Sequence, residues 1–128
     1  MQLSCIISLS MFYFRKETNV KKLNHALTNE DCIAISSAIA VLPEYSFFNQ
    51  NSEFAQLTPL ITSVLKKLST HKPIKNPREC YLIAVAIDSA IGAINGSLSI
   101  STEGLNSIRE HFFTYNKLFP IFKDLLVE

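Results

Sequence analysis

The sequence predicts an all-α fold, a compact bundle of about six to seven helices around a central apolar helix at about residues 77–94. Apolar residues make up 48% of the chain and charged residues 18%, which supplies ample core material for one ordered domain. Only three glycines and five prolines interrupt the chain, and the prolines fall between apolar stretches, as at helix boundaries. Helix-capping residues precede several of these stretches. We therefore treat residues 1–128 as a single helical domain.

The first fourteen residues form an apolar run that fits a helix better than a strand. A helical stripe places together Leu3, Ile6, Ile7, Met11 and Phe14, although alternation around Ser8 to Met11 leaves a strand open. The run is shorter than the roughly 20 residues needed to cross a bilayer. Its basic pair, Arg15-Lys16, follows it, the reverse of a signal peptide. We expect a core element in a cytoplasmic protein, followed by a short helix near Asn19.

Two helices are predicted in the next third of the chain. Thr28-Asn29-Glu30-Asp31 supplies a capping hydroxyl and acidic residues for the first turn of a helix that continues through uncharged residues 32–42 and ends before Pro43. Residues 43–52 lack apolar periodicity and are rich in turn-forming types, which favours a loop. Thr58 followed by Pro59 then predicts an N-cap and a helix to about Ser69.

The second half begins with an exposed basic linker at residues 70–76. The sequence Asn76-Pro77-Arg78-Glu79 predicts a helix start, with Asn76 as the cap and Glu79 reaching back to the cap amide. This central helix is apolar on nearly every side and should stop at Asn95-Gly96, with Gly96 as a left-handed C-cap.

The C-terminal part predicts a helix capped by Thr102 and a break at Pro120 before a final turn or two through Val127. The first of these helices carries Leu105, Ile108, Phe112 and Tyr115 on one side. The aromatic residues from Phe112 to Phe122 could form an exposed patch, but their spacing fits two helix faces closing on one core.

Motifs for catalysis or cofactors are missing from the sequence. It contains no GxxxxGK[ST], GxGxxG, GxSxG or HExxH pattern, and the histidines His25, His71 and His111 fall on separate predicted elements. The cysteines Cys5, Cys32 and Cys80 form no CxxC pair, so we interpret them as buried thiols in a reducing compartment. We expect no metal, no cofactor and no enzymatic activity.

Asp88 is the one carboxylate in the central apolar helix. A raised pKa could make it a general acid or base, but a structural, hydrogen-bonded aspartate is the favoured interpretation. An enzyme that uses Asp88 or His111 is the weakest hypothesis, because neither residue has a visible orienting partner.

Charge is distributed unevenly along a chain whose net charge is only +1. No Lys or Arg lies between Lys22 and Lys66, whereas residues 66–78 hold five basic residues and no acidic one. Carboxylates mixed with aromatic residues suit docking onto a basic protein surface. The predicted partner-binding residues are Glu30, Asp31, Glu44, Tyr45, Phe48 and Glu53. In the alternative, Phe47, Phe48 and Phe54 enter the core and the acids merely solvate its rim.

The capped helices at Thr28-Asn29-Glu30-Asp31 and Asn76-Pro77-Arg78-Glu79, the small size and the lack of an active site together resemble a known class. That class is the small helical immunity proteins of bacterial toxin and immunity pairs, including those of contact-dependent growth inhibition. The resemblance implies a partner that is a toxin domain, often a nuclease, blocked at its active site or a nearby surface. Catalysis would belong to that partner.

The expected partner is a protein. The toxin domain should present a basic surface, and the near-neutral net charge argues against direct binding to nucleic acid or to a membrane. A monomer is favoured. The alternative function is a helical adaptor or regulatory subunit that homodimerises through the region from Phe112 to Phe122.

Overall fold

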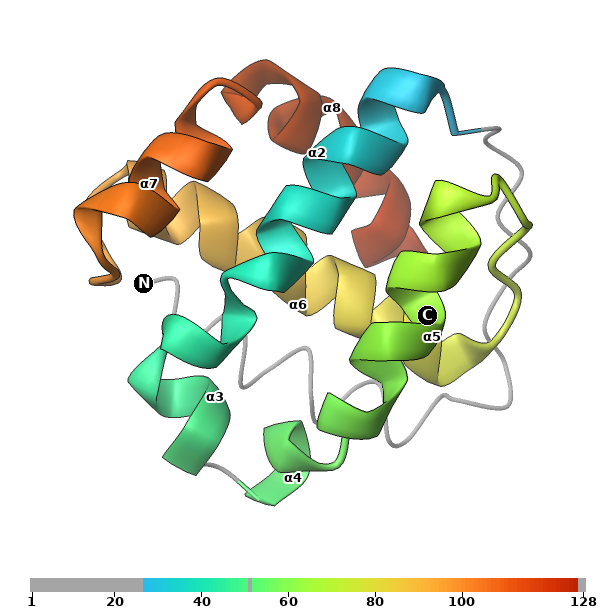
Figure 1. Cartoon of the computed structure of the whole chain (residues 1–128), viewed down its shortest axis with the longest axis horizontal. Coiled ribbons are helices and arrows are strands. Elements are labelled where there is room, and N and C mark those ends of the chain that lie inside the picture. The colour runs from blue at the N-terminus through green and yellow to red at the C-terminus, as the bar shows by residue number, and fades with distance from the viewer. Residues whose placement is uncertain (1–26, 51, 127–128) are drawn as a thin grey trace.

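The computed structural model describes residues 27–50 and 52–126 and is all-α, without a strand in these residues, which confirms the predicted fold class. Figure 1 shows α6 running through the middle of the molecule, with α2 crossing in the foreground. The predicted helix or strand at residues 1–14, the short helix near Asn19 and Cys5 lie outside the described residues.

Helix α2 (Asn29–Ala40) begins as the sequence predicts. The Thr28 hydroxyl accepts a hydrogen bond from the amide of Asp31, and the Asp31 carboxylate accepts one from the amide of Thr28. This reciprocal capping box satisfies two backbone donors that a helix start otherwise leaves free. Cys32, Ala34, Ile35, Ala38 and Ile39 are buried, so α2 turns one side to the core.

The prediction of a loop over residues 43–52 is wrong. A 3₁₀ turn, η2 (Leu42–Glu44), leads into the short helices α3 (Ser46–Gln50) and α4 (Ser52–Ala55). Helices of four or five residues have little intrinsic stability in water. Burial of the aromatic side chains that they carry accounts for them, because Tyr45, Phe48 and Phe54 are each almost fully inaccessible to solvent.

Helix α5 (Thr58–Ser69) matches its predicted end, but its start differs by one residue. Thr58 lies inside the helix and Leu57 is the N-cap, without a side-chain cap bond. Pro59 still occupies the first turn, where the missing amide hydrogen has no helical acceptor to lose. The basic residues Lys66 and Lys67 occupy the last turn, where positive charge offsets the helix dipole.

Helix α6 (Pro77–Ile94) is the predicted central helix, and every residue from Glu79 to Ala93 is buried. The Asn76 side chain caps it by accepting from the amides of Arg78 and Glu79, while Gly96 adopts the left-handed conformation after its end. Each fully buried leucine or isoleucine contributes roughly 1.5–3 kcal/mol. Glu79 does not serve the cap as predicted, because its carboxylate binds Ser63 and Lys67 of α5.

The last two helices differ from the prediction at three places. Ser101, not Thr102, caps α7 (Thr102–Arg109), because its hydroxyl accepts from the amide of Gly104. The chain breaks at Glu110, so Leu105 and Tyr115 belong to different helices. Helix α8 (Phe112–Leu126) continues through Pro120. This proline is exposed, so the carbonyl that loses its helical donor there can be hydrated.

The core is built around α6, which packs against α2, α5, α7 and α8. The described cysteines, Cys32 and Cys80, are buried and unbridged, as predicted for structural thiols. None of the described helices combines the length and apolar character that a bilayer crossing requires.

Candidate functional site

Asp31, a predicted partner-binding residue, is a structural carboxylate. It is fully buried, and its Oδ1 accepts a 2.8 Å bond from Nζ of Lys117 in α8. Burial alone would raise its pKa, but the bonds from Lys117 and from the Thr28 amide outweigh this effect and lower the pKa below its usual value. Asp31 therefore joins the start of α2 to α8 and is shielded from a docking protein.

Glu44 is exposed, but its carboxylate is bound to the beginning of α7. Oε1 accepts bonds from the Ser101 amide at 3.0 Å and from the Ser101 hydroxyl at 2.8 Å. A Cβ atom at Gly104 would lie only 2.7 Å from Glu44 Oε2, so the glycine makes room for this carboxylate. Negative charge at a helix N-terminus is favourable. Glu44 thus holds η2 against α7.

The aromatic residues of the predicted site belong to the core. Tyr45, Phe48 and Phe54 are buried, and the Phe54 ring stacks on Tyr81 of α6 with centroids 6.5 Å apart. Phe47 is partly buried and packs edge-on against Phe54 at 5.4 Å. The structure thus places Tyr45 and Phe48 where a docking protein cannot reach them. This arrangement agrees with the alternative in which the phenylalanines of this region enter the core.

The acidic stretch of the sequence is therefore not an acidic patch in the described structure. Asp31 is neutralised by Lys117 and Glu44 serves α7, which leaves Glu30 as an exposed carboxylate on the first turn of α2. The side chain of Glu53 lies outside the described set. The predicted site residues are thus divided between helix caps, core and surface.

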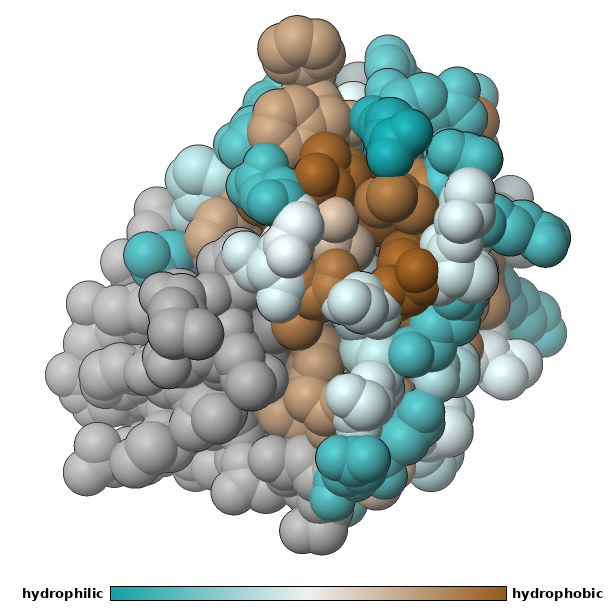
Figure 2. Space-filling view, turned by 90° about the vertical axis from the view of Figure 1, so that its left-hand side faces the viewer, coloured by the Kyte–Doolittle hydropathy of each residue, from teal (hydrophilic) through white to brown (hydrophobic). Residues whose placement is uncertain are grey.

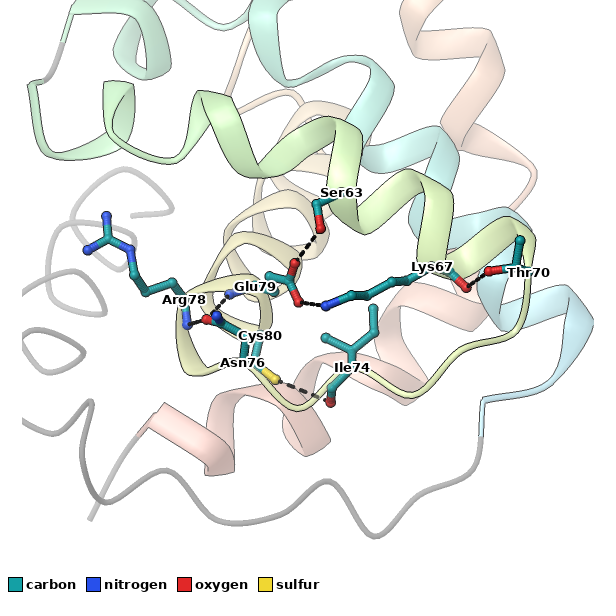
Figure 3. A network of polar contacts seen from close by, with 8 residues as sticks. All are labelled: Ser63, Lys67, Thr70, Ile74, Asn76, Arg78, Glu79 and Cys80. Carbon is teal, nitrogen blue, oxygen red and sulfur yellow. Dashed lines mark hydrogen bonds and ion pairs between the residues drawn. The ribbon is translucent and has the colours of Figure 1, made fainter.

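The basic stretch keeps more of its charge exposed. Figure 3 shows Ser63 and Lys67 of α5 converging on the buried Glu79 of α6, with Lys67 Nζ 2.6 Å from Oε1 and Ser63 Oγ 2.8 Å from Oε2. This contact neutralises Lys67 and fixes α5 on α6. The exposed lysines of the stretch are Lys66, Lys72 and Lys75.

The most exposed large apolar side chain among the described residues is Phe113, at 87%. Its ring contacts Phe112, with centroids 6.2 Å apart. Four more apolar side chains of the same segment are only partly buried against the core. We call these five residues the α7 face: Leu98, Ile100, Leu105, Phe112 and Phe113. Figure 2 shows apolar side chains gathered on the side of the molecule where α7 lies.

The local sequence explains why these side chains stay on the surface. The Ser101 cap and the Glu44 carboxylate fix the start of α7, and the break at Glu110 redirects the chain into α8. Phe112 is partly buried against the core, and Phe113, about 100° further round α8, points to solvent. From residue 95 to residue 108 the only charged side chain is Glu103. The α7 face is therefore an apolar surface with a mixed border of serine, threonine and asparagine and of the exposed charged residues Glu103, Arg109 and Glu110.

Of the residues considered for catalysis, Asp88 lies in the core and His111 directly precedes Phe112 of the α7 face. Asp88 is buried in α6, and desolvation raises its pKa to about 7, although the positive charge of Lys123 acts in the opposite direction. His111 is partly exposed at the start of α8. Over residues 27–50 and 52–126, no three His, Cys, Asp or Glu side chains gather as metal ligands would.

Sequence reasoning missed the two large apolar side chains that are most exposed, Phe113 and, at 50%, Ile33. For Phe113 the signal is partial, because adjacent residues of a helix point about 100° apart and one of two neighbouring phenylalanines can stay outside the core. For Ile33 the sequence signal is weaker, since residues 32–42 are uncharged all round and their pattern does not identify the outer side.

The chain matches no family model, no curated protein and no solved structure.

Proposed function

We propose that this chain is a protein-binding inhibitor whose docking surface is the α7 face. The observation that carries the proposal is the exposure of Phe113 beside partly buried apolar neighbours. Isolated exposed apolar residues are common, but a contiguous apolar patch with a polar border is typical of an interaction surface. The Phe113 ring contacts Phe112, so the two rings present adjoining apolar surface.

The partner in this proposal is a toxin domain of the kind that immunity proteins neutralise. Support comes from the resemblance in size, helix caps and all-α fold. The docking chemistry differs from the acidic docking that the sequence favoured, because Asp31 and Glu44 already have partners within the chain. Apolar contact centred on Phe113 therefore contributes most of the affinity, and Glu30 contributes charge at a separate place.

The experiment is co-expression with the polypeptide encoded immediately upstream, followed by affinity purification and a growth assay. Wild type should form a complex and restore growth. Phe113→Ala should weaken the complex by about thirtyfold or more, the loss expected for a central aromatic anchor. Ile33→Ala is the matched control, because it shortens the other strongly exposed apolar side chain.

Two results would count against the proposal. Equal weakening by Phe113→Ala and Ile33→Ala would remove the α7 face from the interface. The absence of both complex and rescue with the wild-type chain would remove the inhibitor function.

The adaptor alternative requires self-association through the C-terminal aromatic residues. Tyr115 and Phe122 are fully buried and Phe119 is partly buried, so Phe113 is the side chain of this region best placed to contact a second copy. We expect a constant molecular mass over a range of concentrations in light scattering. A mass that doubles with concentration in wild type, but not in Phe113→Ala, would favour the homodimer.

A further inference from the structure

A second surface lies between α2 and the C-terminal end of α5, away from the α7 face. It is a shallow groove of about 280 Å³. Its floor includes Leu68 and the exposed side chain of Ile33, while serines and His71 supply polar groups. The full lining is Asn29, Cys32, Ile33, Ser36, Ser37, Leu68, Ser69 and His71. An apolar side chain with polar groups around it can enter such a groove and bond to its border.

Positive charge borders one end of this groove. Lys66 lies one helical turn before Ser69, and Lys72 follows His71 directly. Both lysines are exposed, as is Lys75, and residues 66–78 contain no acidic residue. Lys67 does not add to this charge, because Glu79 binds it at 2.6 Å. We call the groove together with Lys66 and Lys72 the basic groove.

The neighbouring backbone keeps the basic end accessible. The hydroxyls of Ser69 and Thr70 both donate to the carbonyl of Lys66, so a carbonyl at the end of α5 is satisfied within the chain. His71 then takes a positive φ of 56°, which ends the helix and turns the chain toward α6. The acidic residues adjacent in sequence to the lining are Glu30 and Asp31, on the first turn of α2, and Asp31 is paired with Lys117. Lys66 and Lys72 supply the charged side chains at the α5 end, so the side-chain charge that a ligand would meet there is positive.

From these features we propose that the basic groove binds an acidic peptide segment that carries an apolar anchor residue. The anchor contacts Ile33 and Leu68, and carboxylates next to it meet Lys66 and Lys72. Charge complementarity identifies the occupant, since a basic segment would meet only like charge at the α5 end. This site is separate from the α7 face, and the inference does not depend on the inhibitor function.

The test uses two fluorescein-labelled peptides, one in which leucine alternates with aspartate and one in which leucine alternates with lysine. Fluorescence anisotropy with the full-length chain should show binding of the aspartate peptide only, weakening as salt is raised. Lys72→Glu should weaken this binding about fivefold. Ile33→Ser should weaken it at every salt concentration, because the anchor loses its apolar contact.

Arg109→Glu is the matched control, since it makes the same charge change at an exposed position on α7. Circular dichroism checks that each variant keeps its helical content. Equal loss in Lys72→Glu and Arg109→Glu would show an effect of net charge alone and would overturn the proposal. Binding of the lysine peptide as strongly as the aspartate peptide would overturn it as well.

The same titration separates this inference from the proposed function. Phe113→Ala should bind the aspartate peptide as wild type does, while it fails to capture the co-expressed partner. Failure of the peptide to bind, with partner capture intact, would remove the basic groove alone.

Discussion

The α7 face and the basic groove both present apolar side chains to solvent, but they differ in the charge around them. Around the α7 face the exposed charged residues are of both signs, with Glu103 and Glu110 acidic and Arg109 basic. The basic groove lies beside two exposed lysines, Lys66 and Lys72. The comparison shows that the net charge of a segment says little about its surface. The acids at positions 31 and 44 are used inside the fold, whereas Lys66, Lys72 and Lys75 remain outside it.

The largest expected effect concerns α6, on which both surfaces depend. Asp88 has a pKa of about 7 in the folded chain because burial disfavours its charge, against 3.8 for the free side chain. Between these values the folded state holds the proton and the unfolded state does not, so stability falls as pH rises. Asp88→Asn should therefore gain stability over wild type by up to about 4 kcal/mol between about pH 4 and pH 8.

Urea denaturation of both proteins across this pH range measures the difference. Hydrogen exchange of α2 and α7 amides should change together, since both helices pack on α6. A stability difference that is independent of pH would contradict the argument. A change in hydrogen exchange confined to α2 or to α7 would show that the stabilities of the two surfaces are not coupled through α6.

The second effect concerns the side of the molecule that carries the groove. Asp31→Asn keeps a capping acceptor but removes the charge that binds Lys117, and should cost about 1–2 kcal/mol at neutral pH. Because folding lowers the pKa of Asp31, this contribution is present above the unfolded value and is lost as pH falls through the folded value. The denaturation curves of wild type and Asp31→Asn, which differ at neutral pH, should therefore approach each other as the pH is lowered below 3.8. A stability difference that does not depend on pH would show that the charge of Asp31 is not the cause.

The third effect concerns Gly104 in α7. The change in stability caused by Gly104→Ala should reverse its sign when Glu44 is absent. Gly104→Ala should cost about 1 kcal/mol, since its Cβ displaces the Glu44 carboxylate from Ser101. In a Glu44→Ala chain the same substitution should stabilise α7 by up to about 1 kcal/mol, the difference in helix propensity between alanine and glycine. A double-mutant cycle by thermal denaturation measures the coupling. Simple additivity would show that residues 44 and 104 act independently.

The smallest effect concerns the aromatic part of the predicted partner site. The Tyr45 hydroxyl is buried and has no hydrogen-bond partner in the described part of the chain. Tyr45→Phe should therefore be neutral or stabilising by up to about 1 kcal/mol, because an unsatisfied buried polar group is removed. Partner capture should not change. Weaker capture of the partner by Tyr45→Phe, at unchanged stability, would show that Tyr45 contributes to the binding surface.

Local signals predicted the parts of the fold that depend on neighbours in sequence. Asn76-Pro77 marks the start of α6 and Gly96 its end, and Thr28 with Asp31 caps α2. The helices at residues 46–55 were missed because burial of their aromatic side chains stabilises them more than local periodicity does. The sequence predicts a helix break at Pro120, whereas α8 continues through it. The general rule that proline ends a helix does not show that this position is exposed to solvent, where proline is tolerated.

The candidate site was harder to predict for a related reason. Lys117 lies 86 residues from Asp31, and Ser101 lies 57 residues from Glu44, so the partners that occupy these acids are invisible to any local pattern. Helix geometry alone does not identify Phe113 as exposed, because the adjacent residues Thr114 and Tyr115 are both buried. The groove could not be inferred either, because its walls come from two helices whose packing depends on the whole core.

The missing Cβ at Gly104 has a consequence for how this sequence can diverge. The space that a side chain would occupy there is filled by a carboxylate from a distant position, so residues 44 and 104 share one volume. In a lineage that keeps glutamate at 44, a side chain at 104 displaces the carboxylate from Ser101, whereas a lineage that shortens residue 44 is free to enlarge residue 104. We expect the two positions to covary among homologous chains, and the order of change to run through position 44 first.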